Sequence, residues 1–258
     1  MTKVTFPGTA TTLLLDMDGV LAEVSKSYRA CILATCHEYG AKSITHDVIS
    51  DWKARGGCNN DWKLSLDLIN SDPNAEKEGV TYEKVTETFE KYYQGDPSTN
   101  TAGLYTLETL IPRVALLEEL EKRCSEKKMA IVTGRPRKDC MAFLKNNKIE
   151  HLFPVCVCME DGPPKPDPFP VLRACELLNV EPSENVIMVG DTPDDIRAAV
   201  AAGCMGVGVA TPEGAAASEK EGLSFDSGKL CTAMKGCGAY CNLKPGFEDL
   251  LDAFPSLN

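Results

Sequence analysis

The feature that most constrains the fold is a set of short apolar runs that alternate with helical segments in the second half of the chain. Each run has the length of a buried strand, and an amphipathic segment separates it from the next. This alternation is typical of βαβ units around a parallel sheet. The predicted strands span 12–16, 129–133, 153–158, 185–190 and 205–209. The predicted helices span 107–124, 137–147, 169–178 and 194–202, and a short strand at 236–240 and a closing helix at 245–254 follow.

The region 21–106 has a different pattern. Helical periodicity recurs at 25–39, 59–69 and 82–93, with loops rich in Gly, Pro, Asn and Asp between these segments and no clear strand. We therefore predict an α/β protein with a Rossmann-like, doubly wound parallel sheet. Its core domain is predicted at 1–20 and 107–258, and an α-helical cap domain is inserted at 21–106.

The charge and the cysteines exclude several classes of partner and site. A formal net charge of −11 argues against a nucleic-acid binder and against a protein that lies on anionic membrane. The first residues lack the apolar core of a signal peptide, and no apolar run approaches the ~20 residues of a membrane span, so we expect a cytoplasmic protein. The 12 cysteines are scattered and are predicted to be reduced thiols. Cys231, Cys237 and Cys241 lack the C-x-x-C spacing of a zinc site.

Polar residues suited to one task follow four of the predicted strands. Because ligands of open parallel sheets bind beyond the carboxyl ends of the strands, these residues are expected to converge on one rim. Taken singly, each motif has a structural explanation. The residues at 16–19 could form an Asp-Gly turn, those at 133–135 a turn that opens a helix, those at 163–168 a solvated connector, and those at 190–195 a helix cap. Their succession in order favours a functional site. The residues are Asp16 and Asp18; Thr133, Gly134 and Arg135; Lys165; and Asp191, Asp194 and Asp195.

Four segments together carry a resemblance to a known family. "LLLDMDGVLAE", "IVTGRP", "PPKPDP" and "IMVGDTPDDIRAAVAAG" resemble, in order and spacing, the four motifs of the haloacid dehalogenase superfamily. The inserted helical region is similar to the α-helical cap of its phosphoglycolate phosphatase and β-phosphoglucomutase branch. The resemblance implies phosphoryl transfer with Mg²⁺ as cofactor.

Carboxylates next to a phosphate ester need a cation, and Mg²⁺ prefers oxygen ligands. Asp16, Asp191 and Asp195 are the expected carboxylate ligands, although Asp194 is an alternative to Asp195. By resemblance, the backbone carbonyl of Asp18 is a further ligand. Asp16 is then the nucleophile that forms an aspartyl-phosphate.

The remaining rim residues have expected catalytic roles. Asp18 protonates the departing alkoxide and later takes a proton from water. Its presence favours phosphoryl transfer over dehalogenation, because a halide needs no proton. Thr133 and the backbone N–H groups beside it hold a phosphoryl oxygen, and Lys165 offsets negative charge. Gly134 and Arg135 are candidate substrate-binding residues, with a surface role as the alternative for Arg135.

Substrate selectivity is expected to come from the cap. The segment 52–63 is the candidate loop facing the active site, and Arg55, Asn59 and Asn60 could bind hydroxyl or carboxylate groups; a solvent-facing loop is the alternative. The primary hypothesis is a Mg²⁺-dependent phosphatase that acts on a small phosphorylated metabolite. A phosphomutase or phosphotransferase shares every core residue with it, and a catalytically idle binding protein is the third hypothesis. The sequence does not predict the oligomeric state.

Overall fold

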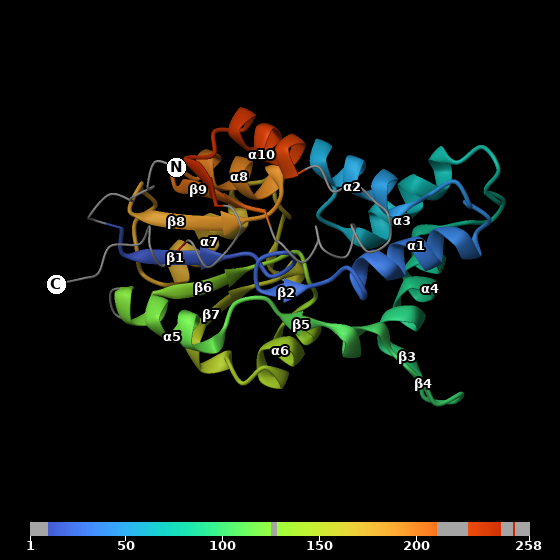
Figure 1. Cartoon of the computed structure of the whole chain (residues 1–258), viewed down its shortest axis with the longest axis horizontal. Coiled ribbons are helices and arrows are strands. Elements are labelled where there is room, and N and C mark those ends of the chain that lie inside the picture. Colours follow the sequence, from blue (N-terminus) through green and yellow to red (C-terminus); the bar gives the residue numbers. More distant parts are fainter. Residues whose placement is uncertain (1–9, 125–127, 211–226, 244–249, 251–258) are drawn as a thin grey trace.

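A single parallel sheet of six strands forms the centre of the protein, as the computed structural model shows for residues 10–124, 128–210, 227–243 and 250 (Figure 1). The strand order is β10-β9-β8-β1-β6-β7 and all neighbouring strands are parallel. The predicted α/β class and parallel sheet are thus confirmed. The strands are β1 (Thr12–Leu15), β6 (Met129–Val132), β7 (Val155–Val157), β8 (Val186–Gly190), β9 (Met205–Val209) and β10 (Cys241–Leu243).

Both faces of this sheet are buried. Leu13 and Leu15 of β1 pack in one hydrophobic core, whereas Leu14 packs in another. Because successive side chains of a strand point to opposite faces, the two cores lie on opposite sides of the sheet. This double burial explains why the central strands occur in the sequence as continuous apolar runs.

Helices cover each face in the doubly wound manner. The buried residues of α5 (Val114–Arg123) and α6 (Arg137–Asn146) belong to the core that contains Leu13. Those of α7 (Phe169–Leu177) contribute to the opposite core, as do Ala198 and Ala199 of α8 (Pro193–Ala201). The helix α10 (Ser227–Gly236) packs beside α8 through a small third cluster.

Four further helices form the cap, which lies beyond one end of the sheet (Figure 1). Aromatic side chains join two of them, because the Tyr28 ring lies 5.7 Å from Phe89 and 4.5 Å from Tyr93 between ring centroids. The helices are α1 (Tyr28–Glu38), α2 (His46–Arg55), α3 (Asp61–Ser71) and α4 (Tyr82–Gln94). A short hairpin of β3 (Gly95–Asp96) and β4 (Thr101–Ala102) follows them.

A two-stranded antiparallel pair lies where the chain passes between core and cap. It consists of β2 (Ala22–Glu23) and β5 (Thr109–Leu110). Each strand belongs to one of the two connections, and we call this pair the hinge. We propose that it marks the domain boundaries, close to the predicted limits of 21–106.

Local predictions differ from the structure at three places. The predicted helix 107–124 begins only at Val114, because residues 109–110 pair in the hinge. Residues 46–55 form a helix that was not predicted, with the side chain of Thr45 capping its first turn. Near the end, residues 227–236 are helical and the strand lies at 241–243 rather than 236–240. Most of the predicted closing helix lies outside the described residues.

Within the described ranges, no helix combines the length and the apolar character needed to cross a bilayer. The cysteines described there are free thiols, and most are buried. The same part of the chain contains one group of three potential metal-ligating side chains, and that group contains no cysteine.

Candidate active site

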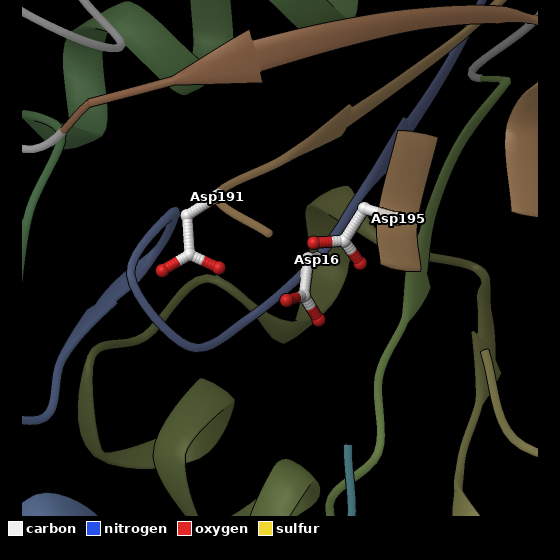
Figure 2. A group of neighbouring side chains, drawn as sticks. All are labelled: Asp16, Asp191 and Asp195. Atoms are coloured by element: carbon white, nitrogen blue, oxygen red, sulfur yellow. The ribbon is translucent and has the colours of Figure 1, made fainter. Parts of the chain in front are cut away.

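Three aspartates gather at the carboxyl ends of two neighbouring strands (Figure 2). Asp16 follows β1, Asp191 follows β8, and Asp195 lies in the first turn of α8. The register of β1 and β8, in which Leu15 pairs with Val189, brings the first two to the same edge. One carboxylate oxygen from each residue lies within 4.8 Å of the other two.

Lys165 joins this cluster from the loop between β7 and α7. Its ammonium lies 2.9 Å from Asp16 Oδ1 and 2.5 Å from Asp195 Oδ1, and it donates to the carbonyl of Val132 at 3.0 Å. Burial opposes its charge, but the two carboxylates outweigh burial and raise the pKa of Lys165 above its ordinary 10.5. The lysine is therefore held cationic against the nucleophile candidate.

The cluster has more negative charge than one ammonium offsets. Burial raises the pKa of Asp16 well above its ordinary value, and the carboxylates of Asp195 and Asp191 raise it further, against the opposing effect of Lys165. Burial and Asp195 likewise raise the pKa of Asp191 to about 7. A set of buried carboxylate oxygens that resist joint ionisation fits the ligand preference of a hard divalent cation such as Mg²⁺.

Backbone geometry allows Asp191 to approach the loop after β1. Gly19 has a φ of +72°, and a Cβ at this position would lie 2.1 Å from Asp191 Oδ2. Any larger residue would therefore displace a carboxylate of the cluster, so the glycine of "DMDG" is required by close packing as well as by its turn.

The neighbouring Asp194 and Asp195 have separate contacts. Asp195 Oδ2 accepts hydrogen bonds from Thr192 N at 2.9 Å and Thr192 Oγ1 at 2.7 Å, so it caps α8 while its other oxygen faces Lys165. Asp194 turns to the cap, where its Oδ2 accepts from Gly57 N at 2.6 Å and Asn59 Nδ2 at 3.2 Å. Asp195 therefore joins Asp16 and Asp191 in the cluster and Asp194 does not, which favours Asp195 over Asp194 as the predicted metal ligand.

Asp18 lies beside an arginine from the next motif. Arg135 is 1% exposed, and its Nε donates to Asp18 Oδ1 at 2.6 Å. The other side of the guanidinium donates to both oxygens of Glu108, at 2.9 and 3.2 Å. The surface role considered for Arg135 is therefore wrong. The guanidinium N–H groups of Arg135 are directed to Asp18 and Glu108. Among the predicted catalytic residues, Arg135 therefore contacts Asp18 through its side chain.

Thr133 and Gly134 directly follow β6, at the edge of the core that faces the cap. Thr133 is buried, and its Oγ1 accepts a hydrogen bond from Arg135 N at 3.1 Å, which leaves the hydroxyl proton to be donated elsewhere. A Cβ on Gly134 would lie 2.7 Å from the carbonyl oxygen of Asn59. Glycine here lets the cap approach the catalytic rim closely.

The three cap candidates from 52–63 have different environments. Asn59 reaches the rim, where its Nδ2 donates to Lys165 O at 2.9 Å. Asn60 caps α3 through its Oδ1 and donates to Tyr82 Oη through its Nδ2, so its amide has a structural role. Arg55 ends α2 and is exposed, with its guanidinium 5.9 Å from the centroid of Trp52. The prediction that Arg55 faces the active site is therefore wrong for this structure.

A small cavity lies between the rim and the cap, and two cations that were not among the predicted site residues, Lys53 and Arg29, contribute to its lining. Lys53 forms an ion pair with Asp61 at 2.7 Å, and Arg29 donates to Ser50 Oγ at 3.0 Å. Lys53 lies in the last turn of α2, two residues before Arg55. Residues two apart in a helix point to different faces, so recognising that helix would have separated Lys53 from the exposed Arg55. The core contributes Asp16, Asp18, Gly134, Asp191, Thr192 and Asp194 to the same lining.

Comparison with known proteins finds a matching family model and similar sequences. The family model described as Haloacid dehalogenase-like hydrolase matches residues 13–209. A protein of Phytophthora nicotianae named imidazoleglycerol-phosphate dehydratase is 47% identical over 245 residues, which is 95% of this chain but 52% of that protein. The chain thus spans about half the length of this relative.

Two other proteins are similar over most of the chain, one in sequence and one in structure. A phosphoglycolate phosphatase of Neisseria meningitidis is 28% identical over 195 residues, covering 75% of this chain and 77% of that protein. The crystal structure of a putative haloacid dehalogenase-like hydrolase from Bacteroides fragilis superposes with a TM-score of 0.68 and 20% identity, covering 93% of this chain and 99% of the other. This second likeness supports the fold alone.

Proposed function

Because the chain belongs to the haloacid dehalogenase-like hydrolase family, we propose that it is a Mg²⁺-dependent phosphatase acting on a small phosphate monoester. One observation carries the proposal: Lys165 contacts the buried Asp16 and Asp195 within a group of three carboxylates that also includes the half-buried Asp191. Such a group suits a reaction in which a carboxylate attacks an anionic phosphoryl group, because the attack requires that charge be neutralised from several sides.

In the first half-reaction, an oxygen of Asp16 forms a bond to phosphorus while the bond from phosphorus to the leaving-group oxygen breaks. Asp18 gives its proton to the departing oxygen, which leaves as an alcohol. Lys165 offsets the negative charge around Asp16, and the Thr133 hydroxyl donates to a phosphoryl oxygen. The product of this half-reaction is an aspartyl-phosphate.

In the second half-reaction, a water molecule attacks phosphorus and its proton passes to the Asp18 carboxylate. The bond between phosphorus and the Asp16 oxygen breaks, which releases inorganic phosphate and restores both side chains. Asp18 thus acts first as an acid and then as a base.

The metal ligands are proposed to be Asp16, Asp191 and Asp195, with the backbone carbonyl of Asp18 as a further ligand. When bound, Mg²⁺ supplies positive charge to the phosphoryl oxygens. The raised pKa values of Asp16 and Asp191 support this choice, because a bound cation relieves the repulsion that raises them.

The cap suggests which leaving groups fit. Arg29 and Lys53 line the cavity that also contains Asp16 and Asp18. Their donors suit a leaving group with hydroxyl or carboxylate acceptors, and the name of the Neisseria relative makes phosphoglycolate the first candidate. The name of the Phytophthora relative adds imidazoleglycerol phosphate as a second.

The test is release of inorganic phosphate from a panel of esters in the presence of Mg²⁺. The panel contains phosphoglycolate, imidazoleglycerol phosphate and β-glucose 1-phosphate, with Asp16→Asn as the inactive control. We expect Mg²⁺-dependent phosphate release from at least one ester, which is lost in the variant. No release together with efficient isomerisation of the sugar phosphate would instead establish a phosphomutase.

A further inference from the structure

The buried arginine between Asp18 and Glu108 has no role in the half-reactions above. Arg135 is the largest of the side chains that are fully buried in the described part of the chain. It forms ion pairs with Asp18 at 2.6 Å and with Glu108 at 2.9 Å. Because a guanidinium is costly to bury without matched partners, these two carboxylates determine where it lies.

Aromatic groups from both domains restrict the arginine further. Its guanidinium carbon lies 4.8 Å from the ring centroid of Tyr28 in α1 and 5.4 Å from that of Phe143 in α6. Its Nη1 also donates to the hydroxyl of Tyr93 in α4 at 3.4 Å. Rotation of the planar guanidinium would break one or more of these contacts, so its direction is fixed by both the core and the cap.

Glu108 connects this arginine to the hinge. The residue directly precedes β5, and its Oε1 accepts hydrogen bonds from Ser27 Oγ at 2.9 Å and Tyr93 Oη at 3.2 Å. Ser27 directly precedes α1, on the first connection to the cap. The Glu108 carboxylate therefore contacts both connections between the domains and the guanidinium that binds Asp18.

Asp18 itself is held on one side only. Its side chain is 27% exposed and lines the cavity shared with the cap, while its Oδ1 accepts from Arg135. Within the described residues, no other side chain is bonded to its carboxylate. With one oxygen fixed, the orientation of the other toward the cavity depends on Arg135.

We propose that Arg135 is a positioning residue that directs the free oxygen of Asp18 at the leaving-group oxygen, with Glu108 linking this orientation to the position of the hinge. The proposal rests on the proposed phosphatase activity. Arg135 touches neither the phosphoryl group nor the metal ligands' carboxylates; it acts through Asp18. In the step concerned, the O–H bond of Asp18 breaks as the bond from phosphorus to the leaving oxygen breaks, and the proton moves to that oxygen.

This role predicts a dependence on the leaving group. An alkoxide leaves slowly unless it is protonated, whereas p-nitrophenolate is stable as an anion and needs little help from an acid. Loss of Arg135 should therefore slow the transfer from an alkyl phosphate much more than the transfer from p-nitrophenyl phosphate. A purely structural role would affect both esters alike.

The experiment compares kcat/KM for phosphoglycolate, or for the alkyl ester that the panel identifies, with kcat/KM for p-nitrophenyl phosphate. This parameter includes only the steps up to release of the alcohol. In Arg135→Gln we expect a loss of about 10²-fold with the alkyl ester and less than about 10-fold with the aryl ester. Arg137→Gln is the matched control, since it removes an arginine two residues away that pairs with Asp161 near the surface.

A second pair of variants covers the case in which Arg135→Gln does not fold. Arg135→Lys keeps a cation between the two carboxylates but lacks the fork that reaches both, and Glu108→Gln leaves the arginine in place without its charged partner. We expect each to shift the alkyl-to-aryl ratio in the same direction by about 10-fold.

Equal decreases in kcat/KM with both esters in these variants would overturn the positioning role of Arg135. They would not contradict the proposed phosphatase function. In contrast, failure of the unmodified protein to release phosphate from either ester would contradict the proposed function itself. The two failures are therefore distinguishable in one set of assays.

Discussion

The catalytic rim of the core and the polar lining of the cap are held in different ways. Asp16, Asp195 and Lys165 lie at or near strand ends, are almost completely buried, and contact one another directly. Lys53 and Arg29 belong to short cap helices and reach the same cavity from the opposite side. The rim is therefore determined by the sheet, whereas the cap lining depends on how two domains meet.

The contacts between the two regions are few and specific. Asp194 accepts from the backbone N–H groups of Gly57 and Cys58, at 2.6 and 3.3 Å, and Asn59 donates to the carbonyl of Lys165. These three contacts each involve a backbone group, and a fourth joins the side chains of Asn59 and Asp194 at 3.2 Å. The chemistry and the selectivity of such an enzyme are therefore expected to respond differently to substitution.

The largest effect is expected at Asp16, the proposed nucleophile of the rim. Asp16→Asn retains the shape of the side chain but removes the attacking carboxylate, and we expect phosphate release to fall by about 10⁴-fold or more. Asp47→Asn in α2, where the carboxylate is exposed, is the control in the cap. Steady-state phosphate assays measure both; comparable losses would contradict the division between the two regions.

The next largest effect is expected at Lys165. Lys165→Met leaves two buried carboxylates without their cation, so we expect the free energy of unfolding to fall by about 3–5 kcal/mol. Lys63→Met removes an equally short but exposed ion pair with Asp67, and about 0–1 kcal/mol is expected there. Urea denaturation of both variants without Mg²⁺ measures the two changes in the free energy of unfolding. Equal decreases would contradict the expectation that the buried ion pair stabilises the fold more than the exposed one.

A smaller effect is expected inside the cap. Lys53→Met removes a cation that lines the cavity, and a KM increase of about 10-fold with an acceptor-bearing ester is expected, because a charge-assisted hydrogen bond is lost. Arg55→Met should change KM by less than about twofold, since its side chain lies at the surface. Should Arg55→Met raise KM more than Lys53→Met, the cap closes differently in solution.

The smallest expected effect is on thermal stability and depends on pH. Burial and Asp195 raise the pKa of Asp191 from 3.8 to about 7 in the metal-free protein. Between these values the folded protein keeps a proton that the unfolded chain has lost, so this group contributes less stability as pH rises from about 4 to about 7. Mg²⁺ displaces that proton, so its stabilising effect should grow over the same range.

Melting temperatures measured at pH 5 and pH 8, each with EDTA and with Mg²⁺, test this prediction. We expect the increase caused by Mg²⁺ to be larger at pH 8 by a few degrees, as binding energy adds directly to stability. An equal increase at both values would show that no carboxylate of the rim titrates between them. The same measurement on Lys63→Met should give the unmodified result, because this lysine forms an exposed ion pair with Asp67 and does not line the cavity.

The succession of apolar runs and polar residues along the sequence was enough to predict the sheet and the residues that meet at the rim. Asp16, Thr133, Lys165 and Asp191 each follow a buried strand, and parallel strands place such residues at one edge whatever the surrounding loops do. The hinge strands at 22–23 and 109–110 were missed because each has only two residues, too few for any periodic signal. The helix 46–55 was missed because its apolar stripe is weak and only Ile49 is buried in it.

The sequence by itself thus determined the class of fold and the family, and it predicted the residues that meet at the rim, because these follow from strand order and from the spacing of residues within each motif. Only the tertiary structure decided which of Asp194 and Asp195 joins Asp16, that Lys53 rather than Arg55 faces the cavity, and that Arg135 binds Asp18. Those choices depend on contacts between segments far apart in the sequence, such as the hydrogen bonds from Gly57 to Asp194 and from Arg135 to Asp18, which span 137 and 117 residues. The energy of such contacts arises only when folding has brought these segments together.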